Sequence, residues 1–194
     1  MNNTNYSILL SVKVYMLFAR SRVVFLLLLV FSKSIQSKVP IVFHPNYDIS
    51  FFGIENMHPF DTKKYGKIAA HLQNTCNILR EDFYQPEKVS TADLQLVLTT
   101  RYLDSLSYSL TVAQVSEMPI LRYVPNFLLQ RNMLNSMKLA TGGTVLGAQL
   151  AMQHGWAVNL SGGYHHAKSD NSEGFCFFAD IPLAIKKLRA KILH

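Results

Sequence analysis

Residues 159–181 read NLSGGYHHAKSDNSEGFCFFADI, and they decide the fold as well as the chemistry of this chain. The apolar run WAVNL at 156–160 is a strand candidate and leads directly into Ser161, Gly162 and Gly163. Two adjacent histidines follow, and residues 177–192 then show the apolar spacing of a helix. Strand, glycine turn, polar loop and helix in that order predict an α/β fold with functional loops at strand ends.

Outward from this stretch, the chain alternates between the same two kinds of element. Residues 40–44 (PIVFH) predict a second buried strand, which ends at Pro45. Helices are expected over 58–79, 91–98 (capped by Ser90 with Asp93), 102–115, 127–153 (interrupted at Gly142 and Gly143) and 177–192. In the last helix, Ile181, Ile185, Leu188 and Ile192 form one apolar stripe, while Pro119 and Pro125 are expected to break the chain.

Composition limits the class of protein. The chain has 194 residues, 49% of them apolar and 16% charged, which suits one domain with its own core and excludes a disordered chain. Two cysteines make no disulfide framework. Of the net charge of +7, residues 1–37 contribute four basic residues and no acid, so residues 38–194 carry only +3. That excess is too small and too scattered to predict direct nucleic-acid binding.

The N-terminal segment differs from the rest. Residues 8–31 are almost wholly apolar, and VVFLLLLVF at 23–31 follows Arg20 and Arg22 and precedes small serines. The uncharged run is too short to span a bilayer, but its pattern is typical of a secretory signal or signal anchor. An upstream extension, a mispredicted first exon or an interfacial helix associated with a membrane are the alternatives. We therefore divide the chain into an extension, residues 1–37, and a domain, residues 38–194.

The adjacent histidines His165 and His166 are the strongest candidates for chemistry. Glycines before them let the backbone turn sharply and approach a ligand closely. Two imidazoles in one cavity, each titrating near neutral pH, suit general acid–base catalysis. A pair of surface histidines without a catalytic role is the competing interpretation, and the residues around the pair decide against it.

Those residues resemble the histone deacetylase family, in particular its class IV branch. The resemblance runs in the expected order from about residue 38 to the end of the chain. It is carried by HPFD (58–61), RYL (101–103), PNFL (125–128), TGGT (141–144), GWAVN (155–159), GGYHHA (162–167) and GFCFFADI (174–181).

The resemblance implies a three-layer α/β/α fold of the arginase–deacetylase type with a mainly parallel sheet, and zinc-dependent hydrolysis of acyl-lysine amides on histones or other proteins. It makes His166 the general base and then acid, and His165 its electrostatic partner. Gly163, Gly174 and Phe175 would bind the substrate's alkyl chain. Cys176 is expected to be a small buried neighbour and Asp180 to brace the last helix, whereas His58 and Asp61 are expected to be structural. His44, His71 and His154 receive no role.

The chain departs from the family pattern at the metal. The family holds zinc with an Asp-x-His pair and a later Asp, but none of the seven aspartates is followed two positions later by His. We therefore expect an N-terminal portion of the catalytic domain, incomplete at its C-terminal side, with no metal ligand of its own and no activity alone.

Three hypotheses stay open from the sequence. The chain is part of a lysine deacylase with room for longer acyl groups, a truncated paralogue that binds partners without catalysis, or a secretory or membrane-associated protein. The resemblance implies a location in nucleus and cytoplasm, whereas a signal within residues 1–34 would direct the protein to the secretory pathway.

Overall fold

The computed structural model describes residues 40–50, 53 and 61–192. Contacts between Cα atoms divide the chain into residues 1–37 and residues 38–194, and all of the described residues belong to the second unit. The expected N-terminal signal or anchor lies outside the described residues. Within the part of the chain that is described, no helix is both long and apolar enough to cross a membrane.

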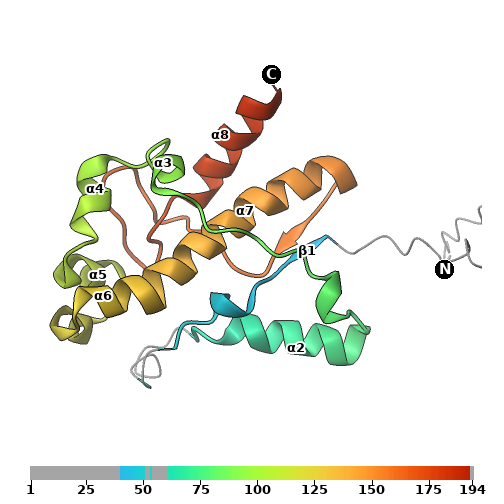
Figure 1. Ribbon diagram of the computed structural model, residues 1–194, viewed down its shortest axis with the longest axis horizontal. Helices are drawn as coiled ribbons and strands as arrows, with labels where there is room; N and C mark the ends of the chain where they lie inside the picture. The colour runs from blue at the N-terminus through green and yellow to red at the C-terminus, as the bar shows by residue number, and fades with distance from the viewer. Residues whose placement is uncertain (1–39, 51–52, 54–60, 193–194) are drawn as a thin grey trace, which may run out of the picture. The chain divides into compact units, whose positions relative to one another are not determined.

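Two short strands and a series of helices make up the described unit (Figure 1). The strands are β1 (Ile41–Val42) and β2 (Val158–Asn159). The α-helices are α2 (Lys64–Cys76), α3 (Thr91–Leu94), α4 (Thr100–Ser105), α5 (Ser109–Val115), α6 (Asn126–Leu129), α7 (Asn135–His154) and α8 (Asp180–Ile192). The short 3-10 helices are η1 (Pro45–Tyr47), η3 (Arg80–Asp82) and η4 (Pro119–Tyr123). A π-helical turn, η5 (Gln130–Leu134), leads into α7.

The sheet is parallel and lies between helices. β1 pairs with β2 in parallel, with Ile41 opposite Val158. Successive strand residues face opposite sides of a sheet. Ile41 accordingly packs with Ala69 of α2, while the methyl groups of Val42 lie beside Gly147 of α7. Helices therefore cover both faces, which confirms the α/β class predicted from the sequence.

The long helix α7 differs from the prediction in where its regular geometry is interrupted. The helix runs unbroken through Gly142 and Gly143, and the irregular turn is η5 instead. The two glycines are sites of close approach: a Cβ at Gly142 would overlap the carbonyl oxygen of Glu87, and one at Gly143 the hydroxyl of Tyr47. A glycine inside a helix thus marks tight packing here rather than a break.

Other boundaries also shift. The helix expected over 102–115 is two helices, α4 and α5, and the one expected from residue 58 begins at Lys64 as α2, with residues 58–60 outside the described range. The expected cap of α3 is confirmed, because Ser90 Oγ accepts a hydrogen bond from the Asp93 amide and the Asp93 carboxylate accepts one from the Ser90 amide.

The apolar stripe predicted on α8 is not the buried face of this helix. Ile181, Ile185 and Ile192 are exposed, whereas Leu183 and Ala184 are buried. The buried face of α8 packs against α7, and it begins with a buried carboxylate, Asp180. Hydrophobic spacing alone could not reveal this face, because its first member is charged.

Candidate active-site loop

The loop between β2 and α8 turns sharply at its two glycines. Gly162 and Gly163 have φ values of 90° and 76°, in the left-handed region that favours glycine. A Cβ at Gly162 would also overlap the side chains of Thr144 and Asp180. The turn places Tyr164 in the core and His165 and His166 at the surface. The sequence therefore needs glycine at residue 162 for both conformation and space.

Asp180, the first residue of α8, holds this turn in place. Its side chain is fully buried and accepts three hydrogen bonds. The donors are the amide of Gly163 (2.7 Å), the amide of Tyr164 (3.0 Å) and the hydroxyl of Thr144 in α7 (2.7 Å). Hydrogen bonds to a carboxylate are about twice as strong as neutral ones, so this contact fixes the loop against both helices. Asp180 braces the histidine loop as well as its own helix.

A network of side-chain hydrogen bonds continues from Thr144 through Asn159 to Tyr47 in η1. Asn159, at the end of β2, donates to the carbonyl of Ala140 (3.1 Å) and to Thr144 Oγ1 (3.2 Å) and accepts from the hydroxyl of Tyr47 (2.8 Å). Burial raises the pKa of Tyr47, which therefore stays neutral and acts as a donor. The end of β2, η1 and the middle of α7 are thus tied to the loop that carries the histidines.

The two histidine rings lie side by side. Their centroids are 4.1 Å apart and their planes are inclined by 42°. Nδ1 of His165 lies 3.2 Å from the carbonyl oxygen of Gly163. When that contact is a hydrogen bond, the proton is on Nδ1 and Nε2 is free to accept.

A second segment, residues 174–175, contacts the His166 ring. Gly174 and Phe175 have φ values of 57° and 62°. A Cβ at Gly174 would lie 3.1 Å from Cδ2 of His166, so the glycine backbone packs directly on that imidazole. Glu117 accepts a hydrogen bond from the Gly174 amide (3.1 Å), and the Phe175 amide donates to Val115 (2.9 Å). The structure thus brings His165, His166 and Gly174 together.

The remaining predicted residues of this stretch lie in or near the core. The ring of Phe175 is buried and packs edge-to-face on Phe177, with centroids 6.3 Å apart. Cys176 is buried, and its thiol donates to the carbonyl of Gly174 (3.4 Å). Burial raises the pKa of Cys176, although the His166 amide acts in the opposite direction by stabilising the thiolate. A neutral thiol packs there as a small apolar group.

Asp61 precedes α2, His71 lies in α2 and His154 ends α7, so none of the three belongs to the histidine loop. Asp61 is on the surface, where its hydrogen bonds from Lys67 Nζ (2.7 Å) and the Lys63 amide lower its pKa. His58 lies outside the described residues, and His71 and His154 are exposed.

His44 has a role that the sequence analysis missed. Its Nδ1 accepts a hydrogen bond from the Asn46 amide (3.0 Å), which caps η1, and the ring lines a polar cavity. Burial lowers the pKa of His44, so the ring is neutral near pH 7. Its position directly before Pro45 and Asn46 was the available signal, since a short polar side chain or histidine before such a turn can cap it.

The described residues do not fit a zinc site. Across residues 40–50, 53 and 61–192, no group of three or more His, Cys, Asp or Glu side chains is placed to hold a metal ion. Catalytic zinc sites use about three such ligands.

Comparison with known proteins agrees on one family. The histone deacetylase domain matches residues 58–194. Histone deacetylase 2 of Arabidopsis thaliana is 42% identical over 149 residues, which are 77% of this chain and 38% of that protein. An uncharacterized Picosynechococcus protein is 30% identical over 152 residues, 78% of this chain and 48% of that protein. The chain thus spans less than half the length of either relative.

A solved structure shows the same fold. The crystal structure of the HDA15 HD domain superimposes with a TM-score of 0.59, at 17% sequence identity, over 80% of this chain and 44% of that one. At this identity the likeness concerns the fold alone. It confirms the arginase–deacetylase type of α/β architecture expected from the sequence.

Proposed function

Since this chain belongs to the histone deacetylase family, we propose that its protein hydrolyses the acyl amide of modified lysines on histones or other proteins. The observation that carries the proposal is the contact between the paired imidazoles of His165 and His166 and the glycine backbone at Gly174. Because the chain spans 38% of its Arabidopsis relative, the activity is proposed for the whole protein.

His166 is the proposed proton carrier. In the reaction a water oxygen bonds to the acyl carbon, the carbon–nitrogen bond breaks, and the lysine amine leaves with a proton. His166 takes the proton from the water and returns it to the amine, and His165 is its electrostatic partner. Zinc dependence is general in this family. Because no group of described residues is placed to hold a metal ion, no step is assigned to one.

The proposed substrate-binding residues are Gly163, Gly174 and Phe175. A methylene chain packs well against the exposed backbone at Gly163. The ring of Phe175 is buried, so that residue is proposed to contribute through its backbone beside Gly174. The family resemblance leaves room for longer acyl groups. With +3 on residues 38–194, direct nucleic-acid binding is not part of the proposal. Location in nucleus and cytoplasm is proposed from the family, and a secretory route is the alternative.

The test uses the native-length protein with acetylated and long-chain acylated histone peptides. We expect His166→Asn to lower kcat by about 10²-fold or more with little change in KM, and His165→Asn to have a smaller effect. His71→Asn removes an exposed histidine from α2 and serves as the control. Equal activity in the His166→Asn and His71→Asn variants would exclude the proposed role of the loop.

The second candidate function is binding without turnover. It is supported by the fact that the histidine loop and residues 174–175 are positioned by contacts within this chain. The same peptides, labelled for fluorescence anisotropy, distinguish the two functions. Binding of the acetylated peptide in preference to the unmodified one, with no product released over hours, would favour the binding protein.

A further inference from the structure

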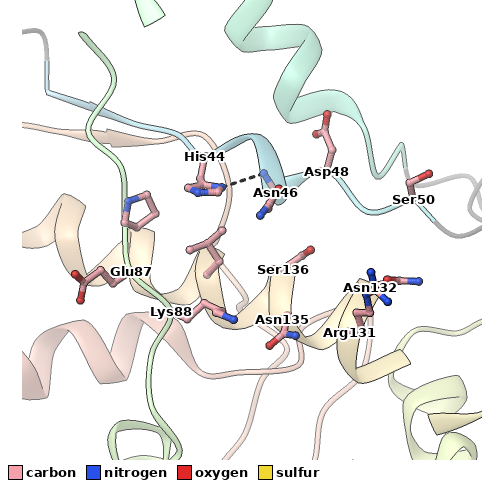
Figure 2. A pocket seen from close by; sticks show the side chains of 12 residues that line it. His44, Asn46, Asp48, Ser50, Glu87, Lys88, Arg131, Asn132, Asn135 and Ser136 are labelled. Atoms are coloured by element: carbon pink, nitrogen blue, oxygen red, sulfur yellow. Dashed lines mark hydrogen bonds between the residues drawn. The ribbon is translucent and has the colours of Figure 1, made fainter. Parts of the chain in front are cut away.

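A polar cavity of about 670 Å³ lies on another part of the described unit (Figure 2). It shares no residue with the histidine loop. Its walls come from residues 44–50, which include η1, from the segment at 86–88, and from η5 with the first turns of α7. The residues that line it are His44, Asn46, Asp48, Ser50, Pro86, Glu87, Lys88, Arg131, Asn132, Asn135, Ser136 and Leu139.

The walls of this cavity are held firmly. The segment carrying Lys88 lies flat on α7, where Gly142 leaves room for the Glu87 carbonyl and the Val89 amide donates to the Lys138 carbonyl (3.3 Å). The wall carrying His44 is fixed by the cap of η1 and by the bond from Tyr47 to Asn159. Preformed walls reduce the cost of ordering a ligand site.

Two cationic side chains, Lys88 and Arg131, are among the residues that line the cavity. Within the described part of the chain, neither Lys88 nor Arg131 makes a side-chain hydrogen bond or ion pair. Arg131 lies in the π-helical turn η5, a rare geometry that often occurs at functional sites. Figure 2 shows the ammonium group of Lys88 directed toward Asn135.

The two carboxylates among the lining residues are directed elsewhere. Asp48 accepts a hydrogen bond from the Gly66 amide (3.0 Å), so its charge is turned toward α2. In Figure 2 the carboxylate of Glu87 points away from Lys88 and Asn135. The charge presented to the cavity interior is therefore positive.

Neutral donors complete the lining. Because Nδ1 of the uncharged His44 accepts from Asn46, the ring proton is on Nε2 and available to a ligand. Asn132 and Asn135 contribute amide groups, and the hydroxyl of Ser136 opens on the same space (Figure 2). Amide, hydroxyl and imidazole donors beside guanidinium and ammonium groups are the set that binds oxyanions.

We propose that this cavity binds a small phosphate-bearing molecule through Lys88 and Arg131, with the His44, Asn135 and Ser136 donors on its remaining oxygens. The volume suits a ligand of metabolite size. Arginine supplies a planar fork for two phosphate oxygens, and lysine a point charge. The inference is independent of the proposed function, because the histidine loop contributes nothing to the cavity.

The test measures binding of inorganic pyrophosphate to the native-length protein by calorimetry, with citrate as a carboxylate probe of similar charge. We expect pyrophosphate to bind with a dissociation constant below 1 mM, about tenfold more tightly than citrate, and more weakly as salt is raised. The double variant Lys88→Gln/Arg131→Gln should weaken binding at least tenfold. The double variant Arg189→Gln/Lys191→Gln, which removes the same charge from exposed positions on α8, should bind as the wild type does.

Further outcomes are equally decisive. Asn135→Asp adds a negative charge to the cavity while leaving both cations, so it should also weaken pyrophosphate binding at least tenfold and serves if the double variant fails to fold. Binding only above about 10 mM, an equal loss in the α8 variant, or full affinity in Asn135→Asp would overturn the proposal. Citrate binding more tightly than pyrophosphate would replace phosphate by carboxylate and overturn the stated ligand class.

Discussion

Replacing Asp180 by asparagine should loosen the histidine loop without removing any atom that touches a substrate. The carboxylate is fully buried and accepts from two backbone amides and from Thr144. The variant therefore isolates the contribution of one side chain to the position of the loop.

The magnitude follows from the geometry of the three bonds. Oδ2 accepts from Gly163 and Thr144, and Oδ1 accepts from Tyr164. An asparagine with its oxygen at the Oδ2 position keeps two bonds at neutral strength and faces its NH2 group toward the Tyr164 amide. An unpaired buried donor costs about 1–3 kcal/mol, and loss of charge adds about 1 kcal/mol. We expect a net loss of about 1–3 kcal/mol in the free energy of unfolding, since removal of a buried charge offsets part of that sum.

The assay is urea unfolding of the native-length protein, combined with amide hydrogen exchange. Asp180→Asn should lower the midpoint and speed exchange at Gly163 and Tyr164, and it should shift the ring resonances of His166. Asp170→Asn, which removes an exposed carboxylate 3.5 Å from Arg101, is the matched control and should change stability by less than about 0.5 kcal/mol. An Asp180→Asn protein as stable as this control, with unchanged exchange at both amides, would refute the reasoning.

Three other perturbations test neighbouring features. Gly174→Ala and Gly163→Ala both place a side chain at positive φ, which costs about 1–2 kcal/mol of stability. Only the Gly174→Ala side chain would contact the His166 ring, so only this variant should shift the NMR resonances of that ring. Burial raises the pKa of Tyr102 to about 12, so this tyrosine should cost about 1.4 kcal/mol of stability per pH unit between pH 10 and 12, and alkaline titration of Tyr102→Phe should show a slope smaller by that amount. Burial lowers the pKa of His44, so folding favours the neutral ring and the free energy of unfolding should fall as the pH drops below about 6.5. The His44→Ala variant should lose about 1 kcal/mol of stability, because the side chain that caps η1 is removed. Its stability should also depend less on acid pH in unfolding scans.

The sequence predicted those features that depend on a few neighbouring residues. The Ser90 cap is a local device, because its donor and acceptor are three residues apart. The histidine pair and its preceding glycines form a motif within one loop. The two apolar runs pair as short parallel strands, although Val158 of the second strand stays exposed. Each of these interpretations needed no knowledge of what lay across the molecule.

The errors came where a distant segment decides the outcome. Gly142 and Gly143 suggested a break in α7, but they are in the helix so that the Glu87 carbonyl and the Tyr47 hydroxyl can approach its backbone. The apolar stripe of α8 suggested its buried face, but that helix packs on α7 through Leu183 and Ala184. The cavity lined by Lys88 and Arg131 was invisible for the same reason, since 43 positions in the sequence separate its two cations.

The position of the histidine pair is therefore a property of helix packing as much as of its own loop. Asp180 and Leu183 lie three residues apart on α8, on the same face of that helix. Leu183 is fully buried, while Asp180 reaches the amides of the loop and Thr144 of α7. The contact that buries apolar surface between α7 and α8 is thus also the contact that sets where His166 lies against Gly174. A change that only repacks this interface would reach the chemistry through Asp180, without touching either imidazole.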